Sequence, residues 1–175
     1  METLNYHQLL KKISIVCNHK KTGLHEPIFS SDDIKSVNQS LYSSLVSSSA
    51  GMVSEFERKL KKYVKSKYCI ATINGTAALH ISLLIVGVKK NDEVLVPPFS
   101  FVSTANSILY CNAIPHFVDI NSDNLGIDTK KLISYLKSIC KKKNGVTYNK
   151  KTGNIIRAII PVHVFGHAVD MKKLI

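Results

Sequence analysis

Apolar residues in the first third of the chain recur at every third or fourth position, which is the spacing of one helix face. Residues 1–24 show this spacing only weakly and are interpreted as an amphipathic start. A helix is predicted to begin at Asp32, its expected N-cap. The apolar face of this helix consists of Ile34, Val37, Leu41 and Leu45. A second helix is predicted over residues 52–66, with an apolar face at Val53, Phe56, Leu60 and Tyr63.

Beyond residue 67 short apolar runs alternate with longer segments of helical pattern. Strands are predicted at 68–73, 94–96, 114–118 and 155–164. Helices are predicted at 77–86, ended by Gly87, and at 101–111 and 128–140. Strands that are apolar on both faces and alternate with helices indicate an α/β fold, a mostly parallel sheet flanked by helices. The polar stretch 141–154 interrupts it, and Asn144-Gly145 predicts a small hairpin there.

The chain has 175 residues and a formal net charge of +12, which raises the question of a nucleic-acid partner. Arg58 and Arg157 are its arginines, and lysine carries almost all of the positive charge. Because base and phosphate readers rely on the two-pronged arginine side chain, a solvated lysine-rich surface is the preferred interpretation. The four cysteines lack a CxxC pair, so neither a disulfide scaffold nor a zinc site is expected. No run approaches the length of a membrane span, and a soluble, cytoplasmic protein without a membrane or nucleic-acid partner is expected.

The segment Asn74-Gly75-Thr76-Ala77 offers the first candidate chemistry. It joins a predicted strand to a predicted helix, so backbone N–H groups and the positive end of the helix are presented to a ligand. A phosphate suits this position, and the Thr76 hydroxyl adds a donor. An ordinary glycine turn with a threonine cap explains the same residues. The patterns GxGxxG and GxxxxGK[ST] are absent, which leaves dinucleotide and P-loop enzymes without support.

A second candidate segment, PPFSFVSTAN at 97–106, follows the next predicted strand. In a parallel sheet it reaches the same edge as the glycine turn, where ligands bind. Phe101 at the start of the following helix is positioned to stack on a planar ligand, whereas Phe99 is interpreted as a core anchor. His163 and His167 are interpreted as site-edge or structural residues and not as metal ligands. No partner is identified for His116.

Four segments taken together carry a resemblance to a known family: NGTAALH, DEVLVPPFSFVSTAN, AIPHFVDINSDNLGID and IIPVHVFGHAVDM. In this order and spacing they resemble the DegT/DnrJ/StrS family of pyridoxal-phosphate (PLP)-dependent nucleotide-sugar aminotransferases, from about His25 onward. The resemblance implies the N-terminal part of the large domain of a fold-type I transferase. It divides the chain into an N-terminal segment, 1–31, and a partial PLP-binding domain, 32–175. The segments LHEP, LVSSSAGMVSEFE and KKKNGVTYNKKTG resemble a subgroup that aminates a 4-keto-6-deoxy sugar on the route to legionaminic-acid-type products.

The resemblance also implies roles for individual residues. Gly75, Thr76 and Ala77 match the family's phosphate-holding turn, and Phe101 matches the aromatic residue that stacks on the cofactor ring. Asp119 matches an acidic position where a turn role and a site role are equally expected. The implied partners are a nucleotide-sugar substrate, an amino-acid donor and a second subunit, since the family forms homodimers in which the loop 45–53 approaches the site.

Length is the main departure from the family, whose members are roughly twice as long, as a domain with a second core requires. The acidic residue that pairs with the pyridine nitrogen and the lysine that carries the cofactor are expected beyond residue 175. No catalytic residue is therefore assigned, and the chain is expected to be inactive alone and poorly soluble. Two alternatives remain open: a non-catalytic or regulatory relative of the aminotransferases, and a small binding domain with a basic surface.

Overall fold

The computed structural model describes residues 5–18, 27–44, 47 and 51–175. Its internal contacts divide the chain into two compact units, Met1–Cys69 and Ile70–Ile175. Leu45 and most of the loop 45–53 lie outside the described residues, so the predictions for them remain untested. No helix in the described ranges is long and apolar enough to cross a membrane.

The first unit contains helices α1 (Tyr6–Val16), α2 (Ser31–Tyr42) and α3 (Gly51–Tyr63). The predicted N-cap Asp32 is wrong, because Ser30 caps α2. The Ser30 hydroxyl accepts from the Asp33 N–H at 3.2 Å, and the Asp33 carboxylate accepts from the Ser30 N–H at 2.7 Å. This reciprocal capping box requires the carboxylate three residues after the cap, a spacing that Ser30 and Asp33 provide. None of the residues described in these helices is buried.

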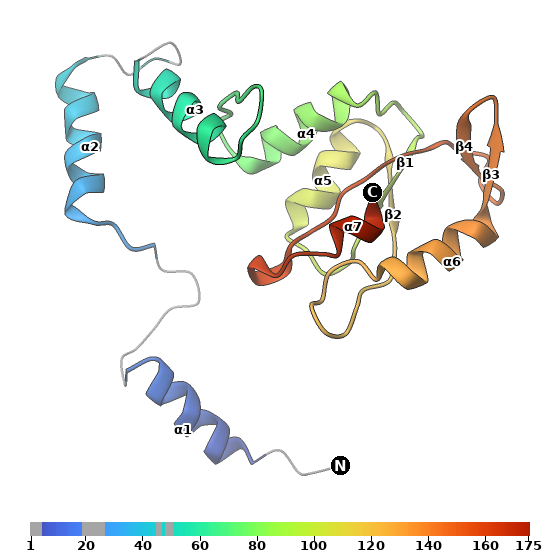
Figure 1. Ribbon diagram of the computed structural model, residues 1–175, viewed down its shortest axis with the longest axis horizontal. Coiled ribbons are helices and arrows are strands. Elements are labelled where there is room, and N and C mark those ends of the chain that lie inside the picture. Colours follow the sequence, from blue (N-terminus) through green and yellow to red (C-terminus); the bar gives the residue numbers. More distant parts are fainter. Residues whose placement is uncertain (1–4, 19–26, 45–46, 48–50) are drawn as a thin grey trace. The chain divides into compact units, whose positions relative to one another are not determined.

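The second unit confirms the α/β fold. Within its residues the strands β1 (Glu93–Val96), β2 (Ile114–Phe117) and β5 (Ile156–Ile159) form a parallel sheet in the order β2-β1-β5. Helices α4 (Gly75–Ile85), α5 (Val102–Tyr110) and α6 (Thr129–Ile139) accompany this sheet (Figure 1).

Strand β1 lies at the centre of the core, and its side chains alternate between two apolar clusters. Val94 and Val96 pack with Leu83 of α4 and Ile108 of α5. Leu95 points to the other cluster, whose buried members are Val118, Ile127, Leu132 and Val169. Because successive strand residues face opposite sides, this division places α4 and α5 on one face of the sheet and α6 on the other.

Two strand predictions need correction. Residues 68–73 do not form a strand, and the apolar side chains of Ile70 and Ile73 are exposed. A run of β-prone residues does not by itself specify a strand, because β-propensity depends on packing against neighbouring strands. The strand predicted over 155–164 is limited to β5, since the chain then forms a short 3₁₀ turn, η1 (Val164–Gly166), and a final helix, α7 (Met171–Leu174).

The predicted hairpin is confirmed as β3 (Cys140–Lys143) and β4 (Val146–Asn149). Asn144 and Gly145 form its turn with φ of 50° and 77°. Both positive values suit a tight two-residue hairpin turn, which explains why Asn-Gly is the strong sequence signal.

A buried carboxylate ties this hairpin to the sheet. Glu93, at the start of β1, accepts hydrogen bonds from the Asn149 side chain at 2.9 Å and from the Thr152 hydroxyl. It also contacts His116 Nδ1 at 2.6 Å, and His116 Nε2 lies 2.9 Å from the Tyr135 hydroxyl. His116 therefore has two partners that the sequence did not reveal. Burial raises the pKa of Glu93, but the hydrogen bonds lower it more, so the pKa lies below its ordinary value.

Candidate cofactor-binding site

The start of α4 supplies the polar half of the candidate site. Asn74 is the N-cap, and its side-chain oxygen accepts from the Ala77 N–H at 2.8 Å. The N–H groups of Gly75 and Thr76 lie in the first turn, where no carbonyl of the helix reaches them. A Cβ added at Gly75 would meet nothing within 4 Å, so the space beside this amide is open. Two backbone donors and the half-buried Thr76 thus lie at the positive end of an 11-residue helix.

The start of α5 supplies the aromatic half. Phe101 occupies the N-cap position of this helix, makes no side-chain cap and is 77% exposed. It lines a cavity of about 250 Å³. The other lining residues come from the loops after β1 and β5 and are Phe99, Ser100, Val162, His163, Val164 and Phe165. An exposed ring at the mouth of a cavity is available for stacking on a planar ligand.

Phe99 is not the core anchor that the sequence suggested. It is 43% exposed, and its ring meets that of Phe165 edge to face at a centroid distance of 6.2 Å. The run of buried residues that includes β1 ends at Pro97, and the chain then leaves the core at the sheet edge. Phe99 therefore belongs to the wall of the cavity.

The two halves of the candidate site lie at the carboxyl edge of the sheet. Helix α5 begins directly after the carboxyl end of β1 and leads back to the start of β2. Helix α4 packs against α5 and ends at Ile85, before the turn into the amino end of β1. Both helices therefore start at the carboxyl edge, where parallel α/β sheets bind their ligands. The structure brings Gly75, Thr76, Ala77 and Phe101 to that edge on neighbouring helices.

Phe165 and His163 were not assigned a cofactor role from the sequence. Phe165 has φ 50° and ψ 27°, a left-handed conformation that is uncommon for an aromatic residue. His163 Nδ1 accepts from the Val169 N–H at 3.1 Å, so the neutral ring carries its proton on Nε2. The glycine after Phe165 was the available signal, since Gly166 also has a positive φ and marks a sharp turn.

Two candidates from the sequence remain, Asp119 and His167. Asp119 follows β2, and its carboxylate accepts from Lys131 Nζ at 2.6 Å and from the Ile120 N–H at 2.9 Å. The Lys131 hydrogen bond is the main reason that the pKa of Asp119 lies below its ordinary value. These contacts favour the turn role for Asp119. His167 is exposed, and in the described ranges no three His, Cys, Asp or Glu side chains gather as metal ligands would.

Comparison with known proteins shows which family the chain belongs to. Residues 27–175 match the DegT/DnrJ/EryC1/StrS aminotransferase family. GDP-perosamine synthase of Vibrio cholerae is 31% identical over 151 residues, which are 86% of this chain and 37% of the relative. The spore coat polysaccharide biosynthesis protein SpsC of Bacillus subtilis is 32% identical over 149 residues, covering 85% of this chain and 34% of SpsC.

Solved structures agree with the sequence matches. A DegT/DnrJ/EryC1/StrS aminotransferase from Brucella abortus superimposes with a TM-score of 0.65 at 26% identity, covering 86% of this chain and 40% of that one. NtdA from Bacillus subtilis, solved with bound pyridoxamine phosphate (PMP), gives 0.65 at 26% identity over 89% of this chain and 34% of NtdA. The chain thus spans little more than a third of the length of these relatives. It belongs to the DegT/DnrJ/EryC1/StrS family of PLP-dependent sugar aminotransferases.

Proposed function

We propose that this chain provides the phosphate- and ring-binding part of a nucleotide-sugar aminotransferase. One observation carries the proposal: two uncommitted helix-start amides and the aromatic cavity occur at the same sheet edge, in a chain that matches the family over residues 27–175. PLP has an anionic phosphate at one end and a planar ring at the other, so it needs both kinds of contact.

The described residues suit that cofactor, and each has a separate task. The Gly75 and Thr76 amides and the Thr76 hydroxyl donate to the phosphate. The Ala77 amide is committed to Asn74 Oδ1, so Ala77 contributes by holding the cap in shape. The exposed Phe101 ring stacks on the pyridine, which supplies the electron-withdrawing chemistry when bound.

The substrate that we propose is a nucleotide-linked 4-keto-6-deoxy sugar, with an amino acid as the amino donor. The relatives named GDP-perosamine synthase and spore coat polysaccharide biosynthesis protein support a sugar substrate and a role in cell-surface polysaccharide biosynthesis. The segments LHEP and KKKNGVTYNKKTG support the legionaminic-acid branch. A homodimer and a cytoplasmic location stay predictions.

We further propose that residues 1–175 alone do not transfer amino groups. Amino transfer needs a lysine that both holds the cofactor and moves a proton. In the described cavity at the carboxyl edge, the lining residues include no lysine. A mass increase on one lysine after PLP treatment and borohydride reduction would overturn this part of the proposal.

Binding of PLP by the 175-residue chain tests the site itself. Fluorescence titration should give a tighter dissociation constant for PLP than for pyridoxal, because pyridoxal lacks the phosphate. Thr76→Val removes the hydroxyl while keeping the shape, and should weaken PLP binding about tenfold to 100-fold, as expected for one hydrogen bond to a charged group. Pyridoxal binding should not change.

Thr147→Val is the matched control, since it makes the same exchange on β4, in the hairpin. PLP binding by this variant should equal that of the unmodified chain. Equal binding of PLP and pyridoxal by the unmodified chain would contradict the phosphate site. An unchanged dissociation constant in Phe101→Ala would contradict the ring site.

A further inference from the structure

Three hydrogen-bonded side chains link the sheet to α6, apart from the candidate cofactor site. Glu93 of β1 and His116 of β2 lie on neighbouring strands, in which Leu95 is paired with His116. Because Glu93 lies two residues before Leu95, both polar side chains project from the sheet face that carries α6. Tyr135 of α6 is the third member. None of the three lines the aromatic cavity, so this network is independent of the proposed aminotransferase function.

The hydrogen bonds fix the direction in which a proton can move. The Glu93 carboxylate can only accept, so the proton of His116 lies on Nδ1, which donates to Glu93 Oε2 at 2.6 Å. The other nitrogen of a neutral imidazole is an acceptor, and Nε2 lies 2.9 Å from the Tyr135 hydroxyl. The tyrosine O–H therefore donates to His116, which leaves the lone pairs of the tyrosine oxygen available to an electrophile.

Burial holds the histidine in place, while the phenol stays accessible. Glu93 is buried, His116 is half-buried, and the side chains of Asn149 and Thr152 also donate to the Glu93 carboxylate. Tyr135 is 41% exposed and lines a hollow of about 330 Å³ beside β2. The other residues that line this hollow are Phe117, Val118, Asp119, Lys131 and Leu132. A small reagent can therefore reach the tyrosine oxygen.

We propose that Tyr135 is a nucleophilic modification site that takes an acyl group from an activated ester. A nucleophile bonded to a histidine that a carboxylate orients is the arrangement used for acyl transfer, and it is recognised by geometry and not by fold. The Tyr135 oxygen attacks the ester carbonyl, and its proton passes to His116 Nε2. A bond forms between the tyrosine oxygen and the acyl carbon. The bond from that carbon to the leaving oxygen breaks, and His116 returns the proton to the leaving group.

Tyr110 provides an internal control. Its ring meets that of His80 edge to face at a centroid distance of 5.7 Å, nearly the same contact as the 5.6 Å between His116 and Tyr135. In the part of the chain that the structure describes, no hydrogen bond joins Tyr110 to His80. Tyr110 is also the more exposed tyrosine, at 58%. Exposure thus favours reaction at Tyr110, whereas the hydrogen bond to histidine favours Tyr135.

Acetylation of the 175-residue chain by excess p-nitrophenyl acetate tests the proposal. Tyr135 should be acetylated about 100-fold faster than Tyr110, which is the lower end of the gain from general-base catalysis. Mass spectrometry of tryptic peptides follows each tyrosine with time. Equal rates at the two tyrosines, or a faster rate at Tyr110, would overturn the proposal.

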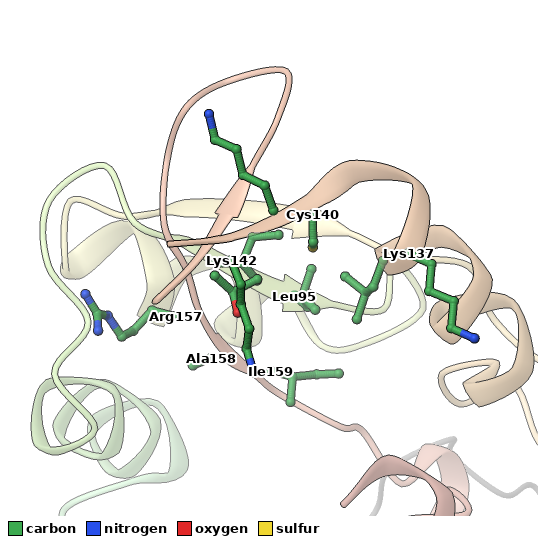
Figure 2. A pocket seen from close by; sticks show the side chains of 11 residues that line it. Leu95, Lys137, Cys140, Lys142, Arg157, Ala158 and Ile159 are labelled. Carbon is green, nitrogen blue, oxygen red and sulfur yellow. The ribbon is translucent and has the colours of Figure 1, made fainter. Parts of the chain in front are cut away.

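The measurement must separate the tyrosine from a nearby thiol, because thiols also react with this ester. Cys140 lines a different and larger hollow of about 560 Å³, between the sheet, α6 and the β3–β4 hairpin (Figure 2). Trypsin cleaves after Lys137, so Tyr135 and Cys140 are recovered on different peptides. Acetyl groups on the thiol are therefore not counted as acetyltyrosine.

Replacing His116 tests the base. His116→Phe keeps a ring but removes the acceptor, and should lower the Tyr135 rate about 100-fold while the Tyr110 rate is unchanged. In His116→Ala, added imidazole should raise the Tyr135 rate again, because the vacated space admits it. In His116→Phe imidazole should not do so, since the phenyl ring fills that space. Restoration in both variants, or an unchanged Tyr135 rate without imidazole, would overturn the role of His116.

Glu93 is a positioning residue, since it reaches the reacting atoms only through His116. In Glu93→Gln a neutral amide stabilises the positive imidazolium less than the carboxylate does. The ratio of the Tyr135 rate to the Tyr110 rate should therefore fall at least about tenfold, as for the loss of one hydrogen bond to a charged group. Circular dichroism checks the fold of each variant. An unchanged ratio in folded Glu93→Gln would limit Glu93 to a structural role and overturn its part in the proposal.

Discussion

The helices of Met1–Cys69 and those of Ile70–Ile175 carry similar apolar patterns, but only the second group buries them. Ile34 and Val37 of α2 are 57% and 60% exposed, whereas Leu132 and Ile139 of α6 are 6% and 5% exposed. The difference is the sheet, since α6 packs on Leu95 of β1. An amphipathic sequence thus identifies the apolar face of a helix, but a packing partner decides whether that face stabilises the fold.

Truncating one isoleucine in each unit should reveal this difference most strongly. Ile108 is fully buried between α5 and the sheet, so Ile108→Ala should lower the free energy of unfolding by about 2–5 kcal/mol. Ile34→Ala should change it by less than about 0.5 kcal/mol. Urea unfolding followed by circular dichroism measures both. Equal losses would mean that the face of α2 is buried in solution.

A buried carboxylate in the second unit should give stability a pH dependence that the exposed carboxylates of the first unit do not. The hydrogen-bonded Glu93 has a native pKa below the ordinary value of 4.5, so its contribution is complete above that value. The contribution is lost as the pH falls through the lowered native pKa. Glu93→Gln should cost about 1.5–3 kcal/mol at neutral pH, because a charged acceptor of several hydrogen bonds is lost.

The pH dependence below 4.5 should be much flatter in Glu93→Gln. Glu55→Gln is the control, since Glu55 is an exposed residue of α3 whose pKa is lowered chiefly by its hydrogen bond with Lys59. Solvent screens that pair, so the control should follow the unmodified chain. Parallel curves for Glu93→Gln and the unmodified chain would contradict the assigned role of Glu93.

The smallest effects are expected at the helix caps. Asn74→Ala removes the acceptor of the Ala77 N–H and should lower the free energy of unfolding by about 1 kcal/mol. Ser30→Ala removes the equivalent bond from α2 and should reduce local helicity without shifting the cooperative transition of the second unit. Denaturant midpoints measure the first, and amide hydrogen exchange within α2 measures the second. A midpoint shift in Ser30→Ala as large as in Asn74→Ala would contradict the contrast between the units.

Local signals account for the parts of the fold that the sequence predicted. Asn144-Gly145 specifies its hairpin through backbone conformation alone, and Gly87 ends α4 with a φ of 82°. The apolar runs at 94–96 and 114–118 are close to β1 and β2 as observed. Each of these features depends on residues that are neighbours in the sequence.

Features that depend on distant residues escaped prediction. The segment 68–73 has the composition of a strand but does not form one, because strand formation depends on neighbours that are distant in the sequence. His116 contacts Glu93, 23 residues earlier, and Tyr135, 19 residues later, so sequence spacing gave no indication of either partner. At the candidate site, Phe101 was identified by its position after a strand. Phe165 lines the same cavity because the loop after β5 folds back beside the loop after β1.

The β3–β4 hairpin offers a place to add sequence without disturbing the core. Its turn residues Asn144 and Gly145 are exposed, whereas Asn149 and Thr152, which hold Glu93, lie on the return toward β5. Exposed loop tips tolerate insertions far better than hydrogen-bonded segments do. An epitope or affinity tag between Asn144 and Gly145 should therefore leave folding intact, and one between Asn149 and Thr152 should not. The hairpin thus provides an internal attachment point for immobilising the protein with both chain ends left free.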